Sequence, residues 1–322
     1  MNRRSIAALA AAAIAAVALS GCSTAGSNTT TTSTPASGPV EITVGVGNEM
    51  AVLPLGKETF SSDRIKIIQK VSAPGGVTAL LLNGQAQLAT TDPASALIAI
   101  SKGVPIQIVA TSMTSGTNAD DDLTGLLVKA DGGPADVKAL SGQTIAVTKL
   151  GGGAQIGAQA GIDQMGGDSK SVKFVELPPA NLIPAVQNGT VAAAVTQEPA
   201  VTRAKQSGLK SLFAPAVANA ASAPVNVYIA TKEYVAGHKD VIDAFIKDLG
   251  TASKKVTSNT DQTRAALAKL GNLSDQEAKS MVLPIYVPNA VDVSKIKEIE
   301  QGMIKYGALN KELDLSTAVY SG

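Results

Sequence analysis

The stretch NGQAQLATTDP, residues 83–93, returns in altered form as NGTVAAAVTQEP, residues 188–199. Each copy begins with Asn-Gly, continues through a short run rich in small and apolar residues, and ends in an acidic residue followed by proline. Glycine tolerates the left-handed backbone that ends a helix, and proline suits the first turn of the next helix. Both copies therefore predict the same unit of helix end, turn, short strand and new helix. Because the units lie about 105 residues apart, they favour two similar lobes, with chance similarity as the alternative.

Strands and helices are expected to alternate on both sides of this repeated unit. From residue 40 to about residue 230, short runs rich in β-branched residues alternate with helix-favouring runs, which is typical of parallel α/β sheets. The expected strands are residues 42–46, 65–71, 88–90, 106–111, 144–147, 172–176 and 192–195. The expected helices are residues 77–82, 94–101, 154–164, 182–187 and 200–206.

The chain beyond residue 230 is expected to be almost entirely helical. The sequence SDQE, residues 274–277, is a capping box that predicts the start of one helix. Residues 292–306 predict an amphipathic helix that stops at Gly307.

The composition excludes several classes of protein. The 322 residues carry a formal net charge of +1 and no Trp, so the chain has neither a basic field for nucleic acid nor indole faces on which bases or sugars stack. With 45% hydrophobic residues it can form substantial cores. Its single cysteine, Cys22, allows neither an internal disulfide nor a metal site built from cysteines, and we expect no metal and no cofactor.

The first 22 residues predict export and a lipid anchor. A positive start, Arg3-Arg4, precedes a 14-residue apolar run that is shorter than the ~20 residues of a membrane span and typical of a signal peptide. The run ends in LSGC, residues 19–22, which is similar to a bacterial lipobox. We therefore expect a signal peptide over residues 1–21, lipidation of Cys22 and a flexible tether over residues 22–39. Ordinary secretion with an incidental cysteine is the alternative.

Several further segments follow one another in a characteristic order. They are ITVGVGNEM (42–50) with LPL (53–55), APGG (73–76), residues 83–93, LSGQTIAV (140–147), VKFVELP (172–178) and residues 188–199. In this order they resemble the bacterial ABC-transporter substrate-binding lipoproteins for sulfonates, taurine, nitrate and thiamine precursors, a family of type II periplasmic binding proteins. Two departures are residues 55–65, where the family usually has a longer Gly/Phe-rich segment, and Gln87, where it usually has Asp. Both predict a different shape of the ligand pocket.

The resemblance implies an α/β fold with two α/β lobes, a two-strand hinge and a helical C-terminal segment. We expect one lobe over residues 40–126 plus 228–322 and the other over 127–227, with the hinge strands near 126–129 and 226–230. It further implies a monomer, held by its lipid at the extracytoplasmic face of the cell membrane, that closes on a small solute and delivers it to an ABC permease. A receptor that presents the ligand to a sensor kinase is the alternative.

Loops that follow the strands are expected to line one cleft between the lobes, because ligands bind at the carboxyl ends of strands in open α/β sheets. The candidates in the first lobe are Asn48, Glu49, Met50, Gly75, Gly76, Thr90, Thr91 and Asp92. Gly75 and Gly76 precede a helix and can offer backbone N–H groups to an oxyanion, or can simply form a turn. Asp92 can hold a ligand or only cap its helix, and Thr91 is the better donor.

The second lobe supplies a glycine-rich loop and the end of one further strand. The candidates are Lys149, Gly151, Gly152, Gly153, Gln155, Gln197 and Glu198. Three glycines let the backbone approach a ligand closely, but no Gly-Lys-Ser/Thr follows, so the loop is not a P-loop. Lys149 can neutralise an anion or lie solvated at the surface. Glu198 can hold an amine or hydroxyl, or only cap a helix.

The expected ligand is a small anion or zwitterion of the sulfonate or taurine type, because glycine-led helix starts favour anions and two acidic residues accompany them. A thiamine precursor or another small heterocycle is the alternative; the absence of Trp disfavours it, although Tyr228 could contribute. Catalysis is not expected. The single histidine, His238, lies in a segment typical of a surface helix start, and the sequence contains no convincing nucleophile–base pair.

Overall fold

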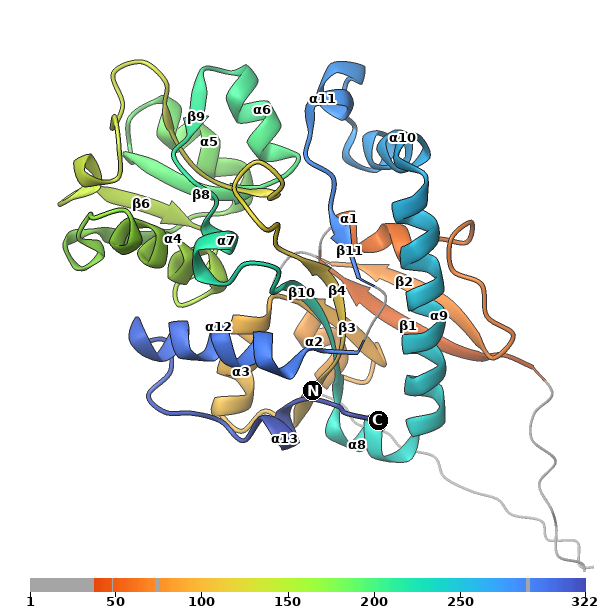
Figure 1. The fold of residues 1–322 in the computed structure, drawn as a ribbon. Helices are drawn as coiled ribbons and strands as arrows, with labels where there is room; N and C mark the ends of the chain where they lie inside the picture. The colour runs from red at the N-terminus through yellow and green to blue at the C-terminus, as the bar shows by residue number, and fades with distance from the viewer. Residues whose placement is uncertain (1–37, 48, 73–75, 288–289) are drawn as a thin grey trace, which may run out of the picture. The chain divides into compact units, whose positions relative to one another are not determined.

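Two mixed β-sheets organise the chain (Figure 1). The computed structural model describes residues 38–47, 49–72, 76–287 and 290–322, which belong to one structural unit. The expected signal peptide, the expected tether up to residue 37 with Cys22, and the site candidates Asn48 and Gly75 lie outside the described residues. Within the ranges described, no helix is long and apolar enough to cross a membrane.

The first sheet has six strands in the order β11-β4-β10-β3-β1-β2. They are β1 (Val40–Val46), β2 (Ile65–Val71), β3 (Leu88–Thr91), β4 (Ile106–Thr114), β10 (Pro224–Thr231) and β11 (Ile285–Tyr286). β1 runs parallel to β2 and β3, whereas β10 is antiparallel to both β3 and β4. A strand from late in the chain therefore lies in the middle of a sheet built mainly from early ones.

The second sheet has five strands in the order β7-β6-β8-β5-β9. They are β5 (Thr124–Lys129), β6 (Thr144–Val147), β7 (Lys173–Glu176), β8 (Ala193–Gln197) and β9 (Leu209–Ser211). β6 runs parallel to β7 and β8, and β5 is antiparallel to both β8 and β9. The two sheets thus share one pattern of three parallel strands, an antiparallel strand and one more, to which the first sheet adds β11 at its edge. The expectation of purely parallel sheets is wrong for β5 and β10, which are joined to their neighbours through long-range contacts.

The repeated unit of the sequence occupies the same place in both sheets. Gly84 and Gly189 have φ angles of 68° and 78°, as expected of glycines that end helices. Each is followed by the strand, β3 or β8, that lies between a parallel and an antiparallel neighbour. The repeat therefore predicted two similar lobes correctly; the first lobe is built on the six-stranded sheet and the second lobe on the five-stranded sheet.

The chain passes between the lobes through residues 115–123 and 212–223. The expected lobe boundaries fall inside strands: residues 126–127 lie in β5 of the second sheet and residues 227–228 lie in β10 of the first. The stretches expected to form the hinge are thus each hydrogen-bonded within a single sheet, and the connecting segments begin and end several residues outside them.

Helices pack on both faces of each sheet. The α-helices are α1 (Glu49–Val52), α2 (Gly76–Leu82), α3 (Pro93–Ser101), α4 (Gly153–Gln164), α5 (Pro179–Gln187), α6 (Ala200–Gln206), α7 (Pro215–Asn219), α8 (Lys232–Gly237), α9 (Lys239–Ser258), α10 (Thr260–Gly271), α11 (Asp275–Ser280), α12 (Val293–Lys305) and α13 (Leu315–Ala318). Short 3-10 turns are Leu53–Leu55, Lys138–Leu140 and Ser169–Ser171. One core of the first lobe includes α9, the other includes α3 and α12, and the second lobe packs α4 on one face and α5 with α6 on the other.

The two departures from the family pattern have roles within the fold. Phe60, from the segment 55–65, is buried against Phe245 of α9 with ring centroids 6.1 Å apart. Gln87 Oε1 accepts a hydrogen bond from Thr43 N at 2.8 Å. Gln87 lies at the amino end of β3, opposite the carboxyl end where the site was expected, so it extends the β1–β3 ladder.

The C-terminal helices begin and end as the sequence indicated. Ser274 and Glu277 form the expected capping box at the start of α11. Asp292 caps α12, and Gly307 follows that helix with φ 76°. The short strand β11 interrupts the otherwise helical segment.

Candidate functional site

Two helix N-termini, one from each lobe, face each other. α3 of the first lobe begins after Asp92, and α4 of the second lobe begins at Gly153. Lys149 Nζ donates a hydrogen bond to Ser95 Oγ across the lobes at 2.9 Å. A Cβ atom added at Gly153 would lie 3.8 Å from Asp92 Oδ1. The structure therefore brings together Asp92, Lys149 and Gly153, which sequence reasoning had assigned to one cleft.

Asp92 is placed by its cap of α3. Its Oδ1 accepts a hydrogen bond from Ser95 N at 2.9 Å, and the residue is partly buried. A carboxylate here satisfies an orphan N–H group and interacts favourably with the helix dipole. The hydrogen bond from Ser95 N is that of a helix cap, which was one of the two roles considered for Asp92. Its other role, contact with a ligand, stays a prediction.

Thr90 and Thr91 end β3 in different surroundings. Thr90 is 2% exposed, and its Oγ1 accepts a hydrogen bond from Gly47 N at 3.3 Å, which ties the end of β3 to the end of β1. Thr91 is partly exposed. Of the two hydroxyls, that of Thr91 stays the better candidate for contact with a ligand.

Of the candidates after β1 and β2, Met50 is held by contacts within the fold. The side chain of Met50 is buried in a core of the first lobe, and its carbonyl accepts a hydrogen bond from Tyr286 Oη at 2.7 Å. Glu49 is the first residue of α1. Gly76 begins α2, whose seven residues give only a short dipole. A Cβ atom at Gly76 would lie 2.5 Å from Ser72 Oγ, a contact that rotation of the serine hydroxyl would relieve.

Two backbone N–H groups of the glycine-rich loop already donate hydrogen bonds to side chains of their own lobe. Leu150 N donates to Glu176 Oε2 at 3.1 Å, and Gly151 N donates to Gln155 Oε1 at 2.8 Å. An anion at these two N–H groups would have to displace a carboxylate and a carboxamide. The expected cradle is therefore reduced to the first turn of α4 together with the side chain of Lys149.

The glycines themselves have distinct places in this loop. Gly151 adopts φ 72°, a left-handed conformation in which a side chain would be strained. Gly152 is buried and is the N-cap of α4, with no side-chain cap to occupy the helix start. Lys149 is exposed apart from its bond to Ser95, so its ammonium group remains accessible to solvent.

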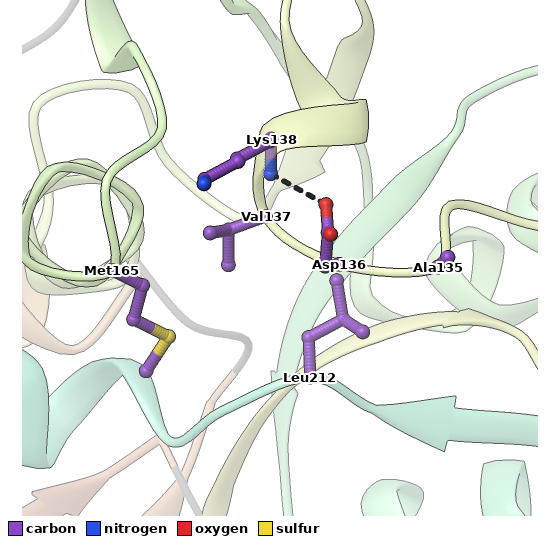
Figure 2. A pocket seen from close by; sticks show the side chains of 6 residues that line it. All are labelled: Ala135, Asp136, Val137, Lys138, Met165 and Leu212. Carbon is purple, nitrogen blue, oxygen red and sulfur yellow. Dashed lines mark hydrogen bonds between the residues drawn. The ribbon is translucent and has the colours of Figure 1, made fainter.

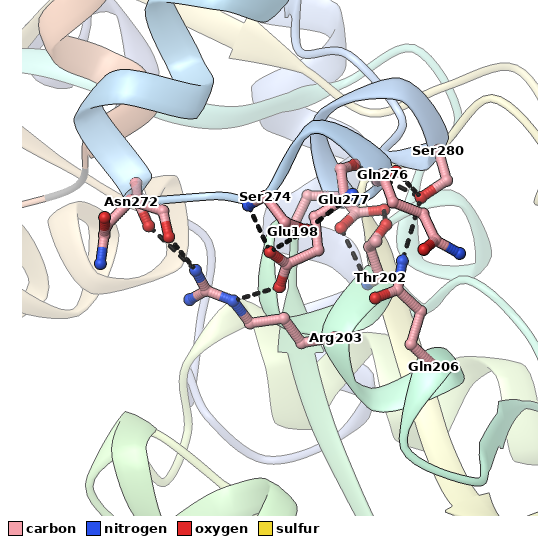
Figure 3. Close-up of polar contacts among 10 residues, drawn as sticks. Glu198, Thr202, Arg203, Gln206, Asn272, Ser274, Gln276, Glu277 and Ser280 are labelled. Carbon is pink, nitrogen blue, oxygen red and sulfur yellow. Dashed lines mark hydrogen bonds and ion pairs between the residues drawn. The ribbon is translucent and has the colours of Figure 1, made fainter.

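Gln197 and Glu198, at the end of β8, differ sharply in burial. Gln197 is exposed, whereas Glu198 is 2% exposed. Glu198 Oε2 accepts from Thr202 N at 3.0 Å, and its Oε1 accepts from Thr202 Oγ1 at 2.9 Å (Figure 3). Glu198 Oε1 also accepts from Val282 N of the first lobe at 3.2 Å. Its carboxylate thus caps the first turn of α6, which was one of the roles expected from the sequence. It also joins the two lobes, which was not expected.

Arg203 of α6 makes a second set of interlobe contacts, for which the sequence pattern carries no signal. Its Nε lies 2.8 Å from Glu277 Oε1, and its Nη2 donates to the carbonyls of Gly271 and Asn272 at 2.9 and 3.1 Å (Figure 3). Hydrogen bonds from the backbone and hydroxyl of Ser274, and then from Arg203, lower the pKa of Glu277 to about 2. The capping box is visible in the sequence, but its arginine lies 74 residues away.

Cavities occur beside the facing helices and elsewhere. One of about 450 Å³ is lined in part by Gly151, Gln155 and, from the end of α12, Tyr306. Another, of about 250 Å³, is lined by Ala135, Asp136, Val137, Lys138, Met165 and Leu212 (Figure 2). The smaller cavity includes none of the expected site residues, and the larger includes two of them.

Metal-binding and catalytic constellations were not expected. In the described part of the chain, no group of three or more His, Cys, Asp or Glu side chains is placed to hold a metal ion. His238 precedes α9, and its exposed ring stacks on Tyr234 with centroids 4.3 Å apart. These are the contacts of a surface helix start, as its sequence context indicated.

Comparison with known proteins identifies a family. Residues 64–263, more than half of the chain, match the family model described as NMT1/THI5 like. No curated protein sequence matches the chain significantly.

Solved structures of binding proteins share the fold at low sequence identity. The periplasmic aliphatic sulphonate-binding protein SsuA from Escherichia coli matches with a TM-score of 0.70 and 18% identity over 88% of this chain and 92% of that one. The alkanesulfonate-binding protein SsuA from Xanthomonas axonopodis pv. citri, bound to MOPS, matches with 0.72 and 19% over 88% and 99%. The ligand-binding component of an ABC-type import system from Staphylococcus aureus, with zinc bound, matches with 0.72 and 16% over 87% and 96%. The expected fold, that of type II periplasmic binding proteins, is confirmed.

Proposed function

The chain belongs to the NMT1/THI5-like family, and we propose that it is the extracytoplasmic substrate-binding component of an ABC import system, not an enzyme. The structures it resembles are named as sulfonate-binding proteins and as part of an import system. The observation that carries the proposal is the approach of Asp92 to Gly153 and of Lys149 to Ser95 across the lobes. Groups from both lobes can then contact one small molecule, so that binding favours the closed arrangement.

The ligand we propose is a small sulfonate that also carries an amine, of which taurine is the simplest representative. The ammonium group of Lys149 and the uncapped first turn of α4 favour the sulfonate end. Asp92 on the facing helix favours an ammonium group at the other end. A sulfonate without an amine would leave the Asp92 carboxylate unpaired near the anion.

A thiamine precursor or another heterocycle is the weaker candidate, because it needs an aromatic face in the cleft. Tyr228 is fully buried and packs edge-on against Phe245 with ring centroids 5.2 Å apart. Its ring is therefore part of the first-lobe core and offers no free face for stacking.

The test is a thermal-shift screen of the purified full chain carrying Cys22→Ser. The probes are taurine, methanesulfonate, nitrate, bicarbonate, thiamine and its pyrimidine precursors. A ligand at 100 times its Kd stabilises the fold by about 2.7 kcal/mol, which is roughly 4–5 °C for a protein of this size. We expect the largest shift with taurine. If only a heterocycle stabilises the chain, the heterocycle candidate replaces the sulfonate.

Two substitutions test the two ends of the site separately. Lys149→Met keeps the aliphatic stem but removes the charge, and should abolish the shift with every sulfonate. Asp92→Asn keeps a good helix cap and should remove only the preference for taurine over methanesulfonate. Lys173→Met, at an exposed lysine of β7 in the same lobe, is the matched control and should change neither result. Wild-type binding by Lys149→Met would contradict the site.

The partners follow from the same proposal. We propose that the closed, loaded chain delivers its ligand to an ABC permease while a lipid on Cys22 holds it at the outer face of the cell membrane. Uptake of labelled taurine by cells without this chain should fall to background. Unchanged uptake together with a lost transcriptional response would favour a receptor that serves a sensor kinase.

A further inference from the structure

A polar contact joins α6 of the second lobe to the helical segment of the first, at a place apart from the facing helices. We call it the α6 contact; it consists of Arg203 with Glu277, Gly271 and Asn272 (Figure 3). It lies beside the hydrogen bond from Val282 N to Glu198 Oε1. None of the first-lobe groups in it follows a strand of the first sheet, so none belongs to the expected ligand-binding loops.

The guanidinium of Arg203 fits its partners in more than one way. Gly271 is the last residue of α10 and Asn272 is its C-cap, so their carbonyls lie at the negative end of that helix. Glu277 presents its carboxylate from the first turn of α11. A planar group with several fixed donors can reach two carbonyls and a carboxylate together, which a lysine ammonium cannot do with the same geometry.

The α6 contact depends on how the lobes are oriented. α6 is fixed to the second lobe through buried Val201 and Ala204, and α10 is fixed to the first through buried Leu267. The lobes are connected through residues 115–123 and 212–223. A rotation about these connections would move α6 away from α10 and α11 and break the bonds of Arg203.

We infer that Arg203 is a positioning residue for ligand capture, which holds the lobes in the arrangement where Asp92 and Lys149 face each other before any ligand is bound. The effect on ligand capture rests on the proposed function, whereas the effect of Arg203 on the arrangement of the lobes does not. Apparent affinity falls in proportion to the fraction of molecules in the competent arrangement. Arg203 therefore tunes ligand affinity without touching the ligand.

The experiment measures the distance between the lobes in the absence of ligand. The full chain carries Cys22→Ser and spin labels at Asp131→Cys in the second lobe and Lys254→Cys on α9 of the first, both exposed positions. Pulsed electron paramagnetic resonance then gives the distance distribution. We expect Arg203→Ala to raise the ratio of displaced to native distances by about two- to fivefold, as suits a partly exposed charged contact.

Matched variants separate positioning from a merely local role. Lys205→Ala removes a positive charge from the same turn of α6, at an exposed residue, and should leave the distances unchanged. Arg203→Lys keeps the charge but loses the planar arrangement of several N–H donors, and should give a distance distribution between those of wild type and Arg203→Ala. Circular dichroism and melting temperature accompany each measurement.

A distance distribution of Arg203→Ala equal to that of the parent chain overturns the inference, and a lower melting temperature with unchanged distances assigns Arg203 a local structural role instead. Because no ligand is present, the result is independent of the thermal-shift screen. A screen in which no probe binds would defeat the proposed function while the distances still decide the inference.

Discussion

Glu198→Gln distinguishes the two roles considered for this residue, a tie within the fold and a contact to the ligand. The carboxylate is 2% exposed and accepts bonds from Thr202 N, Thr202 Oγ1 and Val282 N. Glutamine has nearly the same shape, so the substitution leaves no cavity. It removes the charge and replaces one accepting oxygen by an NH₂ group.

The expected loss of folding free energy comes from the hydrogen bond that Thr202 N donates to Glu198 Oε2. In the variant an NH₂ group faces Thr202 N, which then has no acceptor in a buried place. A hydrogen bond to a charged group contributes about 1.5–3 kcal/mol, and we expect a loss of about 2 kcal/mol. For a protein of this size the melting temperature falls by about 1.5–2 °C per kcal/mol, so the expected shift is roughly 3–4 °C.

The assay is thermal unfolding of the ligand-free chain followed by circular dichroism, repeated with taurine. Gln197→Ala changes the exposed neighbour of Glu198 and should shift the melting temperature by less than about 1 °C. If Glu198 is primarily a ligand contact, Glu198→Gln will leave the ligand-free melting temperature unchanged and remove the stabilisation by taurine. That pair of results would refute the assignment of its carboxylate to the fold.

Three other predictions concern the core, pH and the anchor. Gly161→Ala should lower the free energy of unfolding in urea by about 1–3 kcal/mol, because the added Cβ would lie 2.0 Å from Phe213 Cε2. The control Gly237→Ala should be neutral, because no atom lies within 4 Å of its added Cβ. Equal stabilities of the two variants would contradict the packing of Gly161 against Phe213. Wild type should be more stable than Glu277→Gln above pH 4.5 and should lose this advantage as the pH falls through about 2, because folding lowers the pKa of the Glu277 carboxyl. Melting curves of both proteins across this pH range measure the advantage. A difference in melting temperature that does not change with pH would contradict a role of the ion pair. Cys22→Ser should abolish incorporation of labelled palmitate in cells, and undiminished labelling would exclude the lipobox.

The sequence alone determined many elements of the fold, but not β9, α7 or β11. The strands Ile65–Val71 and Thr144–Val147 have the bounds expected from their runs of β-branched residues. The capping box of α11 was likewise readable, because a cap depends on side chains three positions apart. The approach of Asp92 to the start of α4 agrees with the general placement of ligand-binding loops at the carboxyl ends of strands.

Tertiary structure decided the features that join distant parts of the chain. β10 enters the middle of the first sheet and β5 pairs antiparallel in the second, which no local pattern indicates. Glu198 could be named from the sequence as an acid at a strand end, but its burial and its hydrogen bond from Val282 N, 84 residues away in sequence, could not. Secondary structure and caps depend on neighbours within a few residues, whereas burial and ion pairing depend on which surfaces the folded lobes bring together. That is why Asp92 and Lys149 could be named from the sequence, and Arg203 only from the structure.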